Sequence, residues 1–445
     1  MPLSFPDTDK AWNDALLRAS GRLSEGDELA HLYYEERADL RIGFEVDGAI
    51  EVVPSAQRGM CVRTGGAPPR SVFLGAPALE DADRLVSTAL GEGAGPRPGK
   101  PRSRPPESQA WIAAALAAVQ GLCRHAQRRL SRNEVAIRAS WVAFRQRVHV
   151  ARPGRGVRDD LRQGARVRLD LRAAGVGATG ERALRFPGHD ADLRPLADDV
   201  TERLRERRDV AHAKAGPTAV IFAPGTGGIL IHEVVGHGLE ADTVLRRGSS
   251  FAAGATSGTE EVTVVDDPRR GRAAWRWDDE GVESRAVSLV ERGRVVTYLS
   301  DLTTAGRAGI VASGHGRRSS YRERVLPRMG CTFLAPGRCA PEEIVRETSR
   351  GVLVRRMEAA TVDPLAGRAL FRVTDADAIE RGRPRSPRYP FLLEVDLDTG
   401  LSSLDRVGDD LEFDRCIGSC LRDGQPLSTS VGAPTCRLGV ATVVL

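Results

Sequence analysis

The sequence predicts an α+β protein, with a mixed α/β first half and a second half dominated by a large antiparallel curved sheet or barrel. Helix and strand patterns alternate through the first half, whereas short strands and turn signals fill the second. One helical segment with two histidines lies among those later strands, so we expect the sheet or barrel to carry a metal-site helix. We therefore predict an N-terminal domain over residues 1–214 and a C-terminal domain over residues 215–445.

The first half combines helices with hairpins. Trp12, Leu16 and Ala19 share one face of an expected first helix. Strand-like alternation follows in ELAHLYYEE and RIGFEV, and the Asp-Gly pair after the second segment is typical of a hairpin turn. Residues 91–108 are rich in Pro, Gly and Arg without periodicity, which predicts an exposed loop. Further helices are expected over 78–90, 109–130 and 196–208, and further strands over 134–150 and 166–172.

The second half begins with a buried strand, AVIFAP (219–224), that runs into a glycine-rich turn. This turn resembles a phosphate cradle but lacks the Lys-Ser/Thr of a P-loop, so we favour tight packing between strand and helix as its purpose. A helix is expected over 229–242. Later strands are expected in EVTVV, in the hairpin AVSLVERGRVVTYL, and in ALFRV, FLLEVDL and VATVVL.

Composition argues against several classes of function. Apolar residues make up 41% and charged residues 28% of the chain, as in ordinary soluble proteins. The net charge of +5 comes almost entirely from arginines interleaved with acids, which favours a solvated surface over a nucleic-acid face. We expect no membrane span, because no apolar run is long enough, and the start has no secretory pattern. Seven cysteines without the density of a disulfide scaffold fit a reducing compartment, so we expect a cytoplasmic protein.

The most informative segment is HEVVGH, which starts at His232. Imidazole nitrogens are common zinc ligands, and a carboxylate beside the first imidazole can take a proton from an attacking water, so His232, Glu233 and His237 indicate a hydrolytic metal site. The histidines are five positions apart, which would separate them by about 140° around an α-helix. We therefore predict a local π-bulge or helix break, which Gly236 and Gly238 would tolerate. The competing interpretation is two unrelated histidines on a buried helix.

Further motifs follow HEVVGHGLEAD (232–242) along the second half. They are RRGSS (246–250), VVDD (264–267), DDEGV (278–282), GHGRRSSY (314–321), PRM (327–329), GDDLEFD (408–414), GSCLRDGQ (418–425) and VGAPT (431–435). Together these motifs resemble the TldD/TldE (PmbA) family of zinc metallopeptidases, and specifically its TldD-type subunit, which keeps the metal motif. The resemblance is looser in the first half, where it includes RGMCVRT (58–64).

The resemblance implies three zinc ligands, His232, His237 and Cys420. Cys416 is the rival thiol, but it stands where the family pattern usually has another residue. Three protein ligands leave zinc open for catalysis, whereas four would make the site structural. In such a site Glu233 would act as the general base for peptide hydrolysis.

Two acids follow the histidines and are candidates for an outer layer of the site. Glu240 and Asp242 could orient a ligand histidine through its second nitrogen. Solvated acids at the end of a helix are an equally good interpretation of the same residues.

The segment GHGRRSSY supplies candidates for contact with substrate. His315 stands where relatives often carry Asn, which makes it a candidate substrate-binding residue. A thiolate ligand would make zinc a weaker electrophile, so the oxyanion would need further donors, and Arg317, Arg318 and Tyr321 are the candidates. The remaining cysteines, including Cys331, are expected to pack as small apolar residues.

The resemblance implies a zinc-dependent peptidase that hydrolyses short or unfolded peptides, including the maturation or degradation of a peptide precursor. Family members pair a TldD-type with a TldE-type subunit, so a dimer with a TldE/PmbA-like paralogue is expected. The alternative is a catalytically silent subunit that binds peptides or serves as a scaffold in such a heteromer. Neither a nucleic acid nor a membrane is an expected partner.

Overall fold

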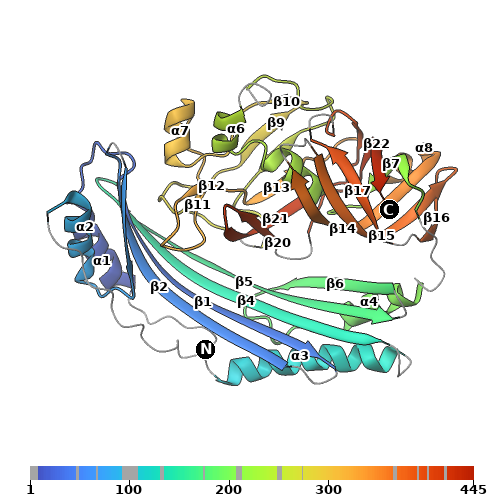
Figure 1. Cartoon of the computed structure of the whole chain (residues 1–445), viewed down its shortest axis with the longest axis horizontal. Coiled ribbons are helices and arrows are strands. Elements are labelled where there is room, and N and C mark those ends of the chain that lie inside the picture. The colour runs from blue at the N-terminus through green and yellow to red at the C-terminus, as the bar shows by residue number, and fades with distance from the viewer. Residues whose placement is uncertain are drawn as a thin grey trace.

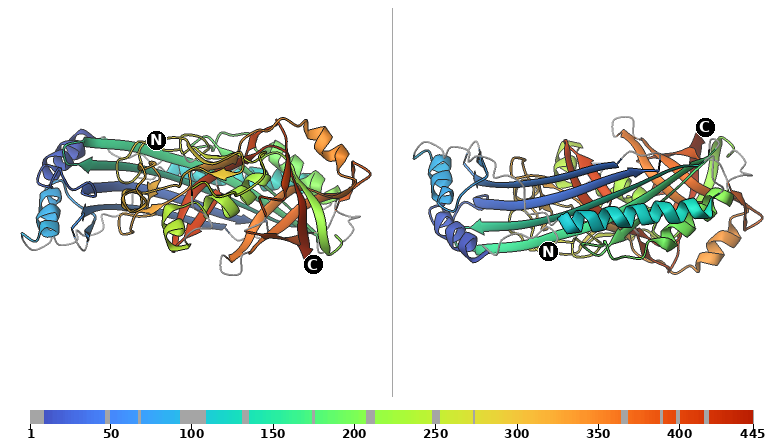
Figure 2. Two further views of the ribbon diagram at one scale, coloured as in Figure 1. Left: turned by 90° about the horizontal axis from the view of Figure 1, so that it is seen from above. Right: turned by 90° about the horizontal axis from the view of Figure 1, so that it is seen from below.

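The computed structural model describes residues 9–46, 50–66, 69–92, 109–130, 135–173, 176–206, 213–247, 253–272, 274–363, 368–387, 390–397, 400–414 and 418–444. The first half builds a long curved sheet, and the second half lies along one face of it (Figure 1). Figure 2 shows the same two layers from above and from below. The predicted loop over 91–108 falls almost entirely outside the described residues.

The long sheet is antiparallel throughout, in the order β3-β2-β1-β4-β5-β6. The two segments predicted as separate strands, ELAHLYYEE and RIGFEV, belong to the single strand β1. The polar residues between them do not interrupt it, because Arg37 and Asp39 bond to each other at 2.8 Å on one face. The strands are β1 (His31–Glu45), β2 (Ile50–Thr64), β3 (Arg70–Gly75), β4 (Ala136–Arg152), β5 (Gly156–Ala173) and β6 (Val176–Leu184).

Four helices cover the two ends of this sheet and bury its apolar residues. At one end, the predicted face of Trp12, Leu16 and Ala19 is buried against the sheet, and Trp12 stacks on Tyr34 with ring centroids 3.8 Å apart. At the other end, a long Ala-rich helix packs on the sheet around Trp141. The helices are α1 (Asp9–Ser20), α2 (Asp81–Leu90), α3 (Gln109–Arg129) and α4 (Arg194–Glu206).

Five strands close a barrel in the second half, in the order β14-β7-β22-β17-β15, with β15 pairing back to β14. All of these pairs are antiparallel except β14 with β7. The predicted fold class, with a sheet or barrel that carries the motif helix, is therefore confirmed. The barrel strands and their neighbours are β7 (Gly216–Phe222), β14 (Arg350–Asp363), β15 (Arg368–Glu380), β16 (Arg383–Pro387), β17 (Phe391–Asp396), β18 (Leu404–Val407) and β22 (Cys436–Val444).

A second sheet stands beside the barrel, in the order β10-β9-β8-β13-β21-β19, with β20 paired to β21. The predicted hairpin AVSLVERGRVVTYL forms its β9–β10 pair. Its strands are β8 (Val264–Asp266), β9 (Val287–Glu291), β10 (Arg294–Val295), β13 (Cys331–Leu334), β19 (Glu412–Phe413), β20 (Gly418–Arg422) and β21 (Gln425–Ala433). A small ribbon and three helices complete this half: β11 (Gly316–Arg317), β12 (Leu326–Pro327), α6 (Ala241–Arg247), α7 (Leu302–Ala308) and α8 (Pro341–Glu347).

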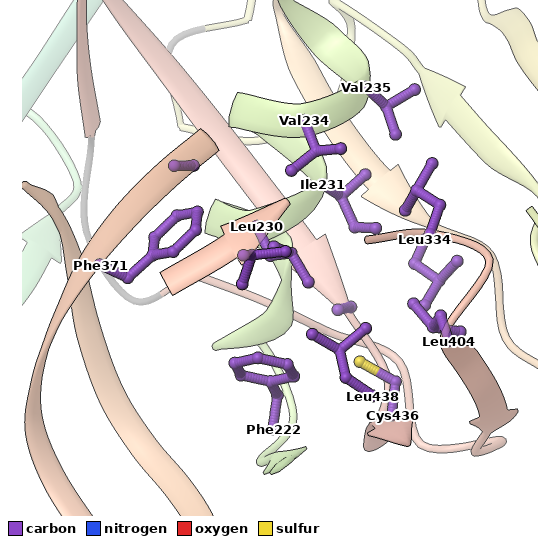
Figure 3. Close-up of a cluster of buried hydrophobic side chains, with 14 of the residues drawn as sticks. Phe222, Leu230, Ile231, Val234, Val235, Leu334, Phe371, Leu404, Cys436 and Leu438 are labelled. Carbon is purple, nitrogen blue, oxygen red and sulfur yellow. The ribbon is translucent and has the colours of Figure 1, made fainter. Parts of the chain in front are cut away.

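The motif helix is embedded in the core of the second half (Figure 3). Its short α-helical start, α5 (Gly227–Ile231), follows β7 directly. Leu230, Ile231 and Val234 project from it among barrel residues such as Phe222 and Leu438. Burial of these side chains fixes the helix, and therefore the direction of the polar residues on its other face.

Buried polar contacts join the two halves. Arg162 on β5 donates to the carboxylate of Asp279 at 2.6 Å, and both side chains are almost fully buried. The backbone N–H of Tyr321 donates to Glu35 on β1 at 3.0 Å. Groups buried in this way need partners, so these bonds fix the register of one half on the other. The domain boundary near residue 215 stays a prediction. In the described part of the chain, no helix has both the length and the apolar character needed to cross a membrane.

Candidate metal centre

The predicted π-turn is present at the motif. Helix α5 passes into a π-helix, η2 (His232–Gly236), in which the N–H of His237 donates to the carbonyl of His232 at 3.1 Å. The wider turn brings both imidazoles to one face, with ring centroids 5.1 Å apart. The spacing of five is therefore compatible with a shared ion, as the sequence suggested.

Gly236 serves this turn through close packing. A Cβ built at Gly236 would lie 1.9 Å from Sδ of Met329, so a side chain there would force the motif and Met329 apart. The prediction had assigned Gly236 to backbone freedom instead. Its residue type is explained by the approach of Met329, which sits in the PRM motif.

Three side chains converge at this point. The ligand atoms of His232, His237 and Cys420 all lie within 4.8 Å of one another, and Sγ of Cys420 is 3.3 Å from Nε2 of His237. The histidines come from η2 and its end, whereas Cys420 comes from β20. His232 and Cys420 are buried, but the His237 side chain is 24% exposed, so the cluster opens toward solvent on that side.

The donor set fits a zinc ion. Two imidazole nitrogens and one sulfur are ligands that zinc accepts, and three of them leave a fourth position open. The buried Nδ1 of His232 has no hydrogen-bond partner within the described ranges, so the three side chains do not satisfy all of their own polar atoms. Glu233 stands beside the opening, with Oε2 3.8 Å from Nε2 of His237.

The charges within the cluster favour a thiolate. Burial alone would raise the pKa of the Cys420 thiol, but His232 and His237 outweigh it and hold that pKa well below its usual range. Burial alone would lower the pKa of His237, but Glu240 and Cys420 raise it well above the ordinary value. A thiolate is the form in which cysteine binds a metal, so the sulfur is prepared for that role.

The outer layer contains one predicted partner and one residue that the sequence did not single out. Nδ1 of His237 donates to Glu240 at 2.9 Å, so Glu240 meets a motif histidine at its second nitrogen. Asp242 does not reach a histidine: both of its oxygens accept from Nη2 of Arg422 at 2.7 Å. Arg422 also pairs with Glu240 at 2.6 Å, so one guanidinium binds both Glu240 and Asp242.

Arg422 could have been found from the sequence. It follows Cys420 by two residues on β20, and alternate residues of a strand share a face. The burial pattern agrees, because Cys420 is buried and Arg422 is partly buried, whereas Ser419 and Leu421 between and beside them are exposed.

Two further residues near the cluster were missed. Arg328, in PRM, donates to the carbonyl oxygens of Cys420 at 2.7 Å and Gln425 at 2.9 Å, which holds the hairpin that carries the cysteine. Asp414, in GDDLEFD, is largely buried, and burial raises its pKa to about 7. Both belong to motifs that carry the family resemblance.

The four candidates for substrate contact lie in and beside the junction between the two halves. His315 is buried and bonds Asp266 at 3.0 Å through Nε2. Arg317 lies over the ring of Trp275 at 4.2 Å, and Arg318 lies over Tyr33 at 4.4 Å. Tyr321 is buried against the long sheet, where a Cβ at Gly59 would lie 2.1 Å from its ring. Their contacts are thus mainly internal, and direct contact with substrate stays a prediction.

The other cysteines within the described residues are free thiols. Cys61, Cys123, Cys331 and Cys436 are buried, and Cys339 is half-buried. Cys416, the rival ligand, lies outside the described residues.

Comparisons with known proteins identify the family of the chain. The family model for the PmbA/TldA metallopeptidase C-terminal domain matches residues 215–444, which is more than half of the chain. By its fold and this match, the chain thus falls within a family of metallopeptidases. The chain is a member of the TldD/PmbA family.

Individual relatives support the assignment, and a solved structure shares the fold. A "Metalloprotease TldD homolog" of Buchnera aphidicola subsp. Schizaphis graminum is 32% identical over 237 residues, covering 52% of this chain and 49% of that protein. A metalloprotease of Methanocaldococcus jannaschii is 35% identical over 240 residues, covering 51% of each. The chain therefore spans about half the length of these curated relatives. The crystal structure of TldE from Thermococcus kodakarensis has the same fold, with a TM-score of 0.72 at 15% identity over 98% of this chain and 100% of that one.

Proposed function

We propose that the protein is a zinc-dependent peptidase that hydrolyses short or unfolded peptides, including a precursor that it matures or degrades. The observation that carries the proposal is the convergence of His232, His237 and Cys420 beside Glu233. The three convergent side chains would hold zinc. When bound, zinc would supply Lewis acidity, which polarises a substrate carbonyl and acidifies water.

The protein's own groups would perform the proton transfers. Glu233 stands 3.8 Å from Nε2 of His237, within reach of a water at the open side of the cluster. Its carboxylate would take the proton of the attacking water and return it to the leaving amine. Glu240 and Arg422 would hold His237 in place while this happens.

A dimer with a TldE/PmbA-like paralogue is part of the proposal. The long sheet and barrel share their fold with a protein named TldE, and the family resemblance implies a pair of unlike subunits. A catalytically silent scaffold is less well supported, because the convergent donors and Glu233 are all retained.

Elemental analysis of the purified protein tests the metal site. Wild-type protein and Cys416→Ala should each contain about one zinc per chain, whereas Cys420→Ala should lose most of it. Equal zinc in Cys420→Ala and wild type would remove Cys420 from the site. Hydrolysis of an unfolded polypeptide, measured with and without the paralogue, then tests the activity, and no cleavage by the zinc-loaded pair would overturn it.

A further inference from the structure

A cavity of about 300 Å³ lies where the end of the long sheet meets helices α6 and α7 of the second half. Figure 1 shows these two helices side by side above the β11–β12 ribbon. We call this cavity the arginine pocket, because five arginines line it: Arg63, Arg246, Arg307, Arg318 and Arg324. Three acids line it as well, namely Asp242, Asp301 and Glu323.

The two inner acids are already satisfied. Both oxygens of Asp242 accept from Arg422 at 2.7 Å. Asp301 caps helix α7, where it accepts from the N–H of Thr304 at 2.6 Å and from its hydroxyl at 2.7 Å. Asp242 also pairs with Arg246 of the pocket at 3.4 Å, and Glu323 is exposed.

Two of the arginines lack an acidic partner. Within the described ranges, Arg307 forms no ion pair, and its side chain is exposed at the mouth. Arg318 is 2% exposed, its Nη2 faces His31 at 2.9 Å, and its Nε has no hydrogen-bond partner among the described residues. A buried N–H without an acceptor costs about 1–3 kcal/mol in proteins generally, so the Arg318 guanidinium is not fully satisfied by its protein neighbours.

The pocket is joined to the candidate metal centre. Asp242 lines the pocket, and Arg422 links Asp242 to Glu240, which holds His237. Three consecutive polar contacts therefore separate the pocket wall from a motif histidine. The lining of the pocket is therefore coupled through side chains to the residues of the candidate metal centre.

We propose that the arginine pocket binds a carboxylate of the peptide substrate and so gives the enzyme a preference for acidic peptides. The inference rests on the proposed peptidase function. Guanidinium groups bind carboxylates through charge-assisted hydrogen bonds, and the exposed Arg307, which forms no ion pair within the described ranges, offers such a group at the mouth of the pocket. The carboxylate can come from an Asp or Glu side chain or from the end of the peptide.

Peptide binding to full-length protein carrying Glu233→Gln tests this without requiring turnover. Three labelled peptides share one sequence: an amidated form with a central Glu, an amidated form with Gln in its place, and the Gln form with a free carboxyl end. Fluorescence anisotropy should give about tenfold tighter binding for one of the two carboxylate peptides than for the amidated Gln peptide. Which carboxylate peptide binds better identifies the source of the group.

Variants inside and outside the arginine pocket test whether the pocket causes the tighter binding of carboxylate peptides. Arg307→Ala should reduce it to about twofold or less, and Arg307→Glu should reverse it. Arg292→Ala removes the same charge from an exposed ion pair with Glu260 outside the pocket, and it should leave the preference unchanged. Equal affinities for all three peptides, or a preference that survives Arg307→Ala, would overturn the proposal. A protein that shows the preference but never cleaves would contradict the peptidase function instead.

Discussion

His237 donates to Glu240 at 2.9 Å through Nδ1, and this bond directs the other ring nitrogen toward Cys420, 3.3 Å from its sulfur. Glu240 is in turn held by Arg422, which stands on the same strand as Cys420. The helix that carries the histidines and the hairpin that carries the thiol are therefore tied together by one buried ion pair.

Arg422→Gln should weaken zinc binding by about 10–100-fold, because it releases Glu240 and loosens the contact between helix and hairpin. Arg422→Lys keeps the charge but not the fork that meets Glu240 and Asp242 together, so its affinity should lie between those of the glutamine variant and wild type. Competition with a chelator measures the Kd. Arg292→Gln, which removes an exposed pair with Glu260, is the control and should bind zinc normally. An unchanged Kd for Arg422→Gln would show that the ion pair between Arg422 and Glu240 is not needed to hold His237 in position for zinc.

Glu233→Gln should bind zinc normally and hydrolyse peptides about 10²–10⁴-fold more slowly, because the amide cannot accept the proton of the attacking water. Zinc content and kcat are to be measured on one preparation. Glu291→Gln, at an exposed position on β9, should keep full activity. Retained turnover in Glu233→Gln would exclude Glu233 as the base.

Gly236→Ala should destabilise the protein by about 1–3 kcal/mol, because the new methyl group would overlap Sδ of Met329. Urea denaturation measures the loss. Gly306→Ala is the matched control, since the same methyl group there meets nothing within 4 Å in helix α7. That variant should be neutral or slightly more stable. Equal stabilities of the two variants would show that the motif can move away from Met329.

Stability should fall as the pH rises through the range in which Glu280 titrates. Burial raises the pKa of Glu280 from 4.5 to about 8, and Asp301 and Asp278 add to the rise. Between those values the folded protein holds a proton that the unfolded chain has released, so the free energy of unfolding decreases with increasing pH. One such group contributes at most about 1.4 kcal/mol per pH unit. Urea denaturation from pH 5 to pH 8 should therefore show a flatter dependence for Glu280→Gln, and identical slopes would refute the assignment.

The sequence predicted those features that depend on local periodicity. The spacing of the two histidines required a π-turn, and η2 provides it. The face of Trp12, Leu16 and Ala19 required an amphipathic helix, and α1 buries these residues. Short strands with turn signals required a sheet or barrel, although which strands would pair could not be read from any one of them.

Features that depend on contact between the two halves escaped prediction. Only residues 166–172 of β5 were recognised, although the strand runs over Gly156–Ala173. The missing part contains Arg162, which is buried because Asp279 from the second half covers it. Polar residues in such a junction look solvent-facing in the sequence. For the same reason, Arg318 was assigned to substrate contact without any sign that Tyr33 would lie beneath it.

The candidate centre takes its imidazoles and its sulfur from segments 183 residues apart. During synthesis on the ribosome, the histidines leave the exit tunnel long before the cysteine is made. A growing chain therefore has an incomplete cluster until the strand with Cys420 has been made, and a chain truncated before that strand never completes it. Under the proposed function, cleavage would have to wait for that strand, which would protect nascent copies from one another.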